Sequence, residues 1–172
     1  MTSDPEPPDG LISVPPKKVD SGVVSPYLVH KVEPGEVVRL GEIEGVFTLP
    51  DRLPEKMLFI SAGSGITPII SMLRSLDHRN ELDDVMVIHC DRVREHVMFL
   101  PDLEDLDRRH DSLRLDLRLT SERGRLSPEE LDELCPDWRD REAFCSGPGE
   151  LLDALIDHWE ANGDPAMLHY ER

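Results

Sequence analysis

MLFISAGSGITPIISML, residues 57–73, joins a short apolar run, a Gly-Ser-Gly turn and an amphipathic segment without a break. The first four residues are apolar throughout and too few for a typical helix, which is the pattern of a parallel strand buried on both faces. The apolar residues after the turn recur at helical spacing, so we expect a helix that packs on a sheet. We predict Thr67 as the N-cap of this helix and Pro68 as its first residue, where a missing N–H costs nothing.

The turn between this strand and this helix has the chemistry of an anion site. Gly63 and Gly65 permit a tight turn and close backbone approach to a ligand. A helix N-terminus at the carboxyl end of a strand binds anions, most often phosphate. The turn is not a Walker A loop, because no Gly-Lys-Ser/Thr follows, and proline replaces the third glycine of GxGxxG. The candidate nucleotide-binding residues of this turn are Gly63, Ser64, Gly65, Thr67 and Pro68.

A second turn of the same kind follows residues 142–145, a short and mostly apolar run. It consists of Ser146, Gly147 and Pro148, and an amphipathic helical pattern comes after it. The carboxyl ends of parallel strands meet at one edge of a sheet, where open α/β sheets bind ligands. We therefore expect the two glycine turns to flank one crevice.

The wider pattern predicts an α/β fold with two domains. Strands alternate with helices over residues 51–172, which indicates a five-stranded parallel sheet with flanking helices, a nucleotide-binding domain. Residues 36–49 alternate and contain two glycines, which favours antiparallel strands, so we expect residues 1–50 to be the end of a β-rich module. The predicted strands are residues 11–14, 57–61, 84–90, 113–119, 142–145 and 166–170, and the predicted helices are residues 22–30, 66–78, 101–109, 128–134 and 148–162.

Composition restricts the partners of the chain. The formal net charge of −17 over 172 residues argues against broad nucleic-acid binding and against docking to anionic membranes. No apolar run approaches the roughly 20 residues of a membrane span, and the first ten residues do not resemble a signal peptide. Three widely spaced cysteines without a CxxC pair predict free thiols in a cytoplasmic protein. They also exclude a plant-type iron–sulfur cluster within this chain, since such a cluster needs four cysteine ligands.

In this order, the elements resemble the ferredoxin–NADP reductase superfamily, and in particular the reductase components of oxygenases and desaturases. The resemblance rests on GSGITP (63–68) followed by IISMLR, and on Ser146-Gly147-Pro148 before an acidic helix. Upstream, GVVS (22–25) resembles the family's segment that contacts the flavin pyrophosphate, and residues 35–50 resemble the last strands of its FAD-binding β-barrel. Residues 1–50 are therefore expected to be a remnant of that barrel. The resemblance assigns flavin contacts to Gly22, Val24 and Ser25.

The resemblance implies hydride transfer from NADPH or NADH to bound FAD. Electrons then pass to an iron–sulfur carrier that serves an oxygenase, a hydroxylase or a fatty-acid desaturase. It places residues 63–67 at the pyrophosphate and residues 146–148 beside the nicotinamide. The family's CGP motif usually puts a thiol there. In this chain Ser146 takes that position and Cys145 precedes it on the opposite strand face, so only one of these two catalytic candidates can face the cofactor.

The residues after the second and third predicted strands bear on the choice between NAD and NADP. An acid at the end of the second strand would accept a hydrogen bond from a ribose 2′-hydroxyl, which is the arrangement for NAD. Arginines in the same region and in TSERGR (120–125) would instead hold a 2′-phosphate. The joint position of the arginines at the expected edge of the crevice favours NADP. The candidate residues at this end are Asp91, Arg92, Ser121, Arg123 and Arg125.

Three departures from the family pattern leave a second hypothesis open. The RxYS flavin motif, expected just upstream of residue 9, is absent, as is most of the barrel, and the chain stops where relatives often continue into a two-iron two-sulfur domain. We therefore expect a chain that begins inside the flavin domain. The alternative is an NAD(P)-binding module without competent FAD binding or reductase activity. A third hypothesis is an interaction fragment whose barrel edges are exposed.

Overall fold

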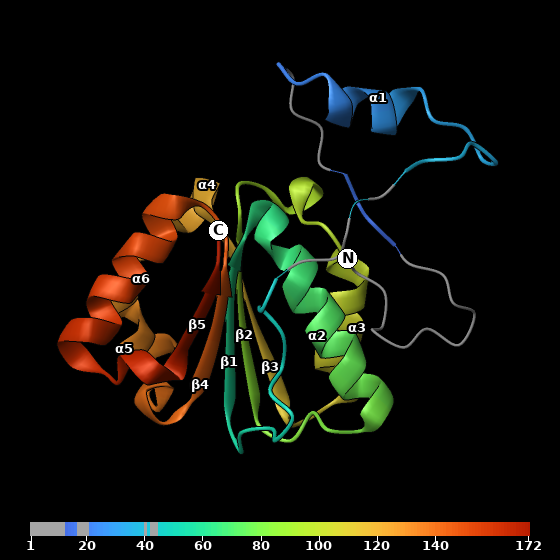
Figure 1. Ribbon diagram of the computed structural model, residues 1–172. Helices are drawn as coiled ribbons and strands as arrows, with labels where there is room; N and C mark the ends of the chain where they lie inside the picture. Colours follow the sequence, from blue (N-terminus) through green and yellow to red (C-terminus); the bar gives the residue numbers. More distant parts are fainter. Residues whose placement is uncertain (1–12, 17–20, 40, 42–44) are drawn as a thin grey trace.

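The computed structural model of the chain describes residues 13–16, 21–39, 41 and 45–172. A five-stranded parallel sheet lies at its centre, with the strand order β3-β2-β1-β4-β5 (Figure 1). The direction of the order reverses at β1, and ligands bind at such a reversal in open α/β sheets. The strands are β1 (Met57–Ala62), β2 (Val85–Asp91), β3 (Leu113–Leu119), β4 (Glu142–Ser146) and β5 (Leu168–Glu171). The five strands predicted for the α/β domain are thus confirmed, with ends that differ by at most two residues.

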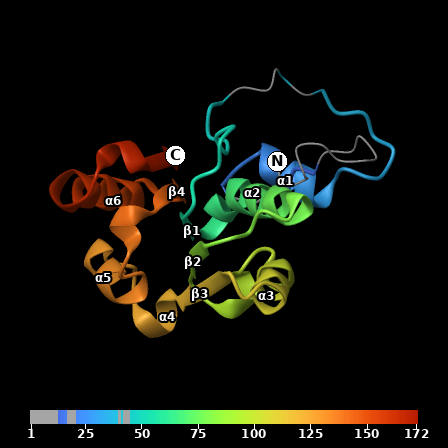
Figure 2. The ribbon, with the colours of Figure 1, turned by 90° about the horizontal axis from the view of Figure 1, so that it is seen from below.

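Helices cover both faces of the sheet, with α2 and α3 on one side and α5 and α6 on the other (Figure 2). Their positions confirm the predicted α/β class, and none of the described helices is long and apolar enough to span a membrane. The helices are α1 (Val24–His30), α2 (Ile66–Arg79), α3 (Leu100–Arg109), α4 (Thr120–Arg123), α5 (Leu131–Leu134) and α6 (Gly149–Asn162). Short 3-10 turns are η1 (Gly63–Gly65), η2 (Arg94–His96), η3 (Pro128–Glu130), η4 (Trp138–Asp140) and η5 (Pro165–Met167).

Strand β1 is buried on both faces, as its unbroken apolar run predicts. Phe59 belongs to the core under α2 and α3, where its ring stacks on Phe144 with centroids 5.4 Å apart. Leu58 and Ile60 point the other way, into the core under α5 and α6. The alternation of side chains along one strand therefore builds two separate cores.

The start of α2 differs from the prediction, and Thr67 is not its N-cap. The turn η1 runs directly into the helix, and Gly65 is the N-cap with φ −61° and ψ −10°. Because the backbone is already helical at Gly65, the helix begins at Ile66, and Thr67 and Pro68 occupy its second and third positions. Pro68 still lies in the first turn, where its missing N–H removes no intrahelical hydrogen bond. At the second turn the helix was predicted to begin at Pro148. In the structure Pro148 is the N-cap, and α6 begins one residue later, at Gly149.

The antiparallel strands predicted for residues 36–49 are absent from the described part of that segment, residues 36–39, 41 and 45–49. Two or three short strands cannot form a stable sheet alone. Among the described residues, the sheet consists of the five strands β1, β2, β3, β4 and β5 and includes no strand from this segment. Phe47 instead packs edge-on against Phe144 at 6.3 Å between ring centroids. The strand predicted at residues 11–14 lies partly outside the described residues, and residues 13 and 14 are irregular. The domain boundary at residue 50 stays a prediction.

A buried arginine connects the amino ends of β1, β2 and β4. Arg141, only 5% exposed, pairs with Asp137 at 2.8 Å and with Asp84 at 2.7 Å. It also donates to the backbone carbonyl of Met57 at 3.3 Å, and Lys56 pairs with Asp137 at 2.8 Å. The hydrogen bonds from Arg141 hold the pKa of the Asp137 carboxyl well below its ordinary value.

This network predicts a specific loss of stability in acid. A carboxyl whose pKa is lowered by folding stabilises the protein above its unfolded-state pKa, about 4, and loses that contribution as pH falls towards the folded-state pKa. We expect Asp137→Asn to unfold at a lower temperature than the wild type at neutral pH, with the difference narrowing in acid. Circular dichroism melting curves at several pH values measure this. Parallel curves for the two proteins would contradict the role of Asp137.

Candidate functional site

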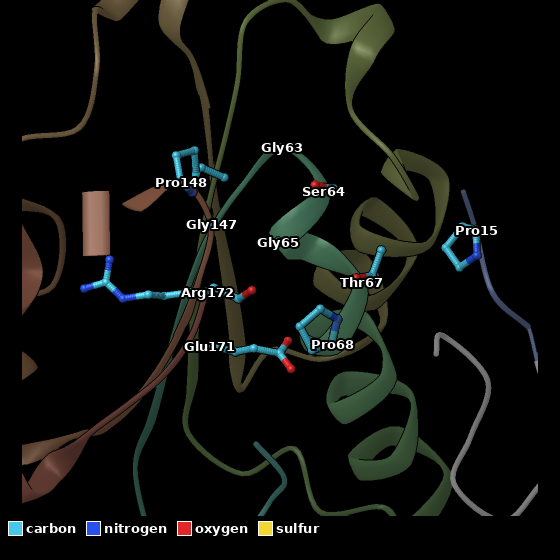
Figure 3. Close-up of a pocket in the computed structure, with 12 residues that line it drawn as sticks. Pro15, Gly63, Ser64, Gly65, Thr67, Pro68, Gly147, Pro148, Glu171 and Arg172 are labelled. Atoms are coloured by element: carbon cyan, nitrogen blue, oxygen red, sulfur yellow. The ribbon is translucent and has the colours of Figure 1, made fainter. Parts of the chain in front are cut away.

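The two glycine turns lie against each other at the carboxyl edge of the sheet (Figure 3). A Cβ atom at Gly65 would lie 2.1 Å from the carbonyl oxygen of Ser146, so only glycine fits there. Gly147 approaches β1 in return, and a Cβ atom there would lie 3.2 Å from the amide nitrogen of Ala62. Gly63 is required for another reason, because its φ of +55° lies in the left-handed region. The turns therefore form one interlocked unit.

A cavity of about 430 Å³ opens between these turns. Figure 3 shows Ser64 and Thr67 on one side and Pro148 on the other, with the Glu171 carboxylate directed towards Pro68. Arg172 pairs with Asp153 on α6. We call this cavity the first pocket. Its lining consists of Pro15, Ala62, Gly63, Ser64, Gly65, Thr67, Pro68, Ser146, Gly147, Pro148, Glu171 and Arg172.

A second pocket, of about 310 Å³, lies over the ends of β1, β2 and β3 beside α6. It shares Ala62, Gly63 and Pro148 with the first pocket, so the two meet at the end of β1. One wall is apolar and the other carries charged groups from the loops after β2 and β3. The residues found only in the second pocket are Cys90, Asp91, Arg92, Thr120, Arg125, Leu126, Glu150, Leu151 and Ala154.

Two pockets that meet at one point suit a long ligand with a group at each end and a negative charge between them. The N-terminal end of η1 and α2 lies where the pockets meet, and a helix N-terminus favours negative charge. Each pocket then offers room for one end of the ligand. In a chain with a net charge of −17, the arginines of the two linings, Arg92, Arg125 and Arg172, offset the charge of their three carboxylates, Asp91, Glu150 and Glu171.

The two catalytic candidates lie on opposite faces of β4. Ser146 is 5% exposed and lines the first pocket. Cys145 is fully buried in the core under α5 and α6, beside Leu58 and Trp138, and burial raises the pKa of its thiol. Because side chains alternate along a strand, Cys145 has no path to the crevice that leaves β4 in place. The structure thus brings Ser146, and not Cys145, to the predicted nicotinamide side.

The candidates for the 2′ position divide between pocket and loop. Asp91 and Arg92 both line the second pocket, and the Asp91 carboxylate accepts a hydrogen bond from the backbone amide of Arg92 at 2.7 Å. Arg125 also lines it and pairs with Glu150 at the surface. Both the acid and two of the arginines are therefore present.

The other two candidates belong to the loop behind this pocket. Arg123 pairs with Asp116 of β3 at 2.8 Å, which directs its guanidinium along the strand. Ser121 donates its backbone amide to the carbonyl of Arg92 at 3.1 Å. Ser121 therefore joins the loop to the end of β2 through its backbone, whereas the prediction concerned contact with the ligand.

The residues assigned to flavin lie apart from both pockets. Gly22 precedes α1, and Val24 and Ser25 begin it. Figure 1 shows α1 away from the sheet, and none of its residues is buried. The described residues of this segment therefore do not enclose a site for FAD.

Two polar groups near the crevice escape a reading of the sequence. The first is a pair: Ser61 and His89 are fully buried on neighbouring strands, with the Ser61 hydroxyl 2.9 Å from the Nδ1 of the His89 ring. Arg118 on β3 is also buried and contacts the loop that carries Arg123 and Arg125. In the sequence it is one more charge in an alternating strand. Its only signal is its place just before the Gly-containing loop.

Residues 59–153, which include both glycine turns, match the family described as the oxidoreductase NAD-binding domain. An NADPH oxidoreductase of Mycobacterium tuberculosis is 40% identical over 162 residues, which cover 94% of this chain and 43% of that protein. The glycine betaine monooxygenase reductase subunit of Pseudomonas aeruginosa is 29% identical over 169 residues, which cover 92% and 46%. The chain thus spans less than half the length of these two relatives.

A solved structure shares the fold. The flavohem-like FAD/NAD-binding domain of a nitric oxide dioxygenase from Vibrio cholerae superposes with a TM-score of 0.75 at 24% sequence identity. The match covers 87% of this chain and 64% of that one. At this identity the likeness concerns the arrangement of the sheet and helices.

The interlocked turns predict that Gly65→Ala is strongly destabilising. The added methyl group would meet backbone atoms of Ser146, which cannot move without disturbing β4, so we expect a loss of about 2 kcal/mol in the free energy of unfolding. Gly149→Ala is the matched control, because its Cβ would lie 3.4 Å from the flexible end of Arg172. Urea unfolding of both variants measures the difference. Equal stability would contradict the close contact between the turns.

Proposed function

Because this chain belongs to the oxidoreductase NAD-binding domain family, within the ferredoxin–NADP reductase superfamily, we propose that it binds a reduced pyridine nucleotide and presents its hydride to a flavin. The observation that carries this proposal is the crevice. Its two pockets meet at Ala62, Gly63 and Pro148, which matches a dinucleotide whose halves are joined by a pyrophosphate. A site for a single small anion would need neither pocket.

Each part of the crevice has a role on this proposal. Residues 63–67 hold the pyrophosphate through backbone N–H groups and the dipole of α2. Residues 146–148 border the nicotinamide, and Ser146 is part of the lining of the first pocket. The apolar wall of the second pocket receives the adenine, because Leu126, Leu151 and Ala154 offer it a water-poor surface.

We favour NADPH over NADH as the nucleotide. Arg92 and Arg125 extend from the two loops that border the second pocket, and we expect their guanidinium groups to bind a 2′-phosphate there. The Asp91 carboxylate accepts the backbone amide of Arg92 with one of its two oxygens, so the preference for NADPH rests on the two arginines. The name of the M. tuberculosis relative, an NADPH oxidoreductase, agrees with this choice.

We further propose that the electrons pass from FAD to an iron–sulfur carrier that serves an oxygenase, a hydroxylase or a fatty-acid desaturase. The name of the P. aeruginosa relative, a monooxygenase reductase subunit, supports this place in an electron-transfer chain. The strong acidity of the chain disfavours a free acidic ferredoxin as the carrier, because like charges slow the encounter. The three free cysteines agree with a cytoplasmic location.

A second candidate function is nucleotide binding without flavin reduction. Two observations favour it: α1 has no buried residue, and the described part of residues 36–49 contains no strand. On this alternative the crevice holds the dinucleotide as proposed, but the chain supplies no enclosed surface for the isoalloxazine ring. The two functions therefore share one site and differ only in the acceptor.

Visible absorption and dinucleotide binding of the purified 172-residue chain test both functions. We expect NADPH at 100 times its Kd to stabilise the protein by about 2.7 kcal/mol. A yellow protein that oxidises NADPH with ferricyanide supports the reductase. A colourless protein that NADPH still protects supports the binding module. If neither NADPH nor NADH raises the melting temperature, both candidate functions fail.

A further inference from the structure

Arg118, the residue before the last of β3, makes an unusual set of contacts for an edge-strand residue. It is only 3% exposed. Its Nε donates to the carbonyl of Gly124 at 2.9 Å, and one terminal nitrogen donates to the carbonyls of Arg123 and Arg125 at 2.9 and 3.2 Å. The other terminal nitrogen pairs with Glu130 at 2.9 Å. One guanidinium therefore binds three consecutive carbonyls and a carboxylate.

Three consecutive carbonyls reach one guanidinium here because α4 ends at Arg123, and the carbonyls of a last helical turn have no intrahelical partner. The chain must then turn at residue 124 for the carbonyl of Arg125 to reach the same group. Gly124 does this with φ +73° and ψ 177°. Nothing lies within 4 Å of a Cβ built there, so the conformation and not the available space requires glycine.

The segment shaped in this way carries the cations of the second pocket. Arg125 leaves the loop at the last of the three bound carbonyls, and its side chain is 85% exposed at the pocket edge. The other end of the loop is attached to the end of β2, because the amide of Ser121 donates to the carbonyl of Arg92. Arg118 thus fixes the backbone from which the Arg125 side chain extends. The same segment is hydrogen-bonded to the backbone of Arg92 through Ser121.

We propose that Arg118 is a positioning residue that sets the selectivity of the crevice for the phosphorylated dinucleotide, by holding residues 123–125 so that Arg125 and Arg92 converge on a 2′-phosphate. This inference rests on the proposed function, since it concerns the adenosine end of the same site. Stability alone is a poor explanation for the arginine. Replacing a buried ion pair by apolar residues of similar volume is often neutral or stabilising. The loop geometry does account for an arginine at this position. A guanidinium has several N–H donors and can bind several carbonyls at once, whereas an apolar side chain can bind none.

Arg141 provides a matched control. It is also buried, it also binds carboxylates and backbone carbonyls, and it lies next to the sheet, one residue before β4. It differs in position, because it lies at the amino ends of the strands, away from both pockets. Loss of either arginine removes a buried charge and leaves its carbonyl and carboxylate partners without their donor. Only loss of Arg118 releases the loop beside the crevice.

The test compares Arg118→Met with Arg141→Met in the whole chain, with Kd values for NADPH and NADH measured by calorimetry. We expect the Arg118 variant to bind NADPH about tenfold more weakly while its Kd for NADH changes less than about twofold. The Arg141 variant should keep the wild-type ratio of the two Kd values, even where its melting temperature falls as far. A general loss of stability would not alter this ratio.

Two further variants separate geometry from charge and protect the test against misfolding. Arg118→Lys keeps the charge but lacks the fork, so its preference for NADPH should also fall. Gly124→Ala keeps Arg118 but strains the reversed backbone, so its preference should fall in the same direction, even if Arg118→Met does not fold.

Four results would overturn the inference. One is a wild-type ratio of the Kd values for NADPH and NADH in both Arg118→Lys and Gly124→Ala. Another is the same ratio of Kd values in Arg118→Met and Arg141→Met. A wild-type chain that binds both dinucleotides equally well would refute the selectivity but leave the proposed function standing. A wild-type chain that binds neither would refute the proposed function and this inference with it.

Discussion

The close approach of Gly65 to the carbonyl of Ser146 is the contact on which the rest of the site depends. It brings the turn after β1 against the turn after β4, at the point where the strand order of the sheet reverses. Any side chain at Gly65 would separate these turns and open the sheet between them. Because no side chain intervenes, the N-terminal ends of α2 and α6 converge on one edge, and a continuous crevice forms with a lobe on each side of β1.

Two buried arginines, Arg141 and Arg118, have different structural roles at opposite ends of the sheet. Arg141 binds the carbonyl of Met57 in β1 and the carboxylates of Asp84 and Asp137, which precede β2 and β4, so it joins the amino ends of three strands. Arg118 binds carbonyls that belong to one loop, so it shapes a border of the crevice. Both satisfy the rule that a buried charge must be paired and hydrogen-bonded. The consequence of each arginine follows from what its partners are attached to, because the guanidinium is the same in both places.

Much of the fold can be read from the residues alone. The apolar runs predict β1, β2 and β4 because strands covered on both faces consist mostly of apolar residues, and the helical spacing after residue 65 predicts α2. The glycine turns predict an anion site at one edge of the sheet. The prediction fails where a local alternative is close in energy. The 3-10 turn η1 extends into α2, so the helix begins before its expected cap at Thr67. Residues 36–49 have the alternation of strands, but in the described part they have no partner strand.

What the residue order determined, then, is the class of fold, the two turns and the type of ligand they suit, because each depends on neighbours in the chain. Folding in three dimensions decided which candidates share a site. Cys145 and Ser146 face opposite sides of β4, and Arg123 pairs with Asp116 and is absent from the lining of the second pocket. Arg118 was invisible in the sequence for the same physical reason. Its partners are backbone carbonyls, which every residue possesses, so only their positions in space distinguish a loop that is held from one that is not.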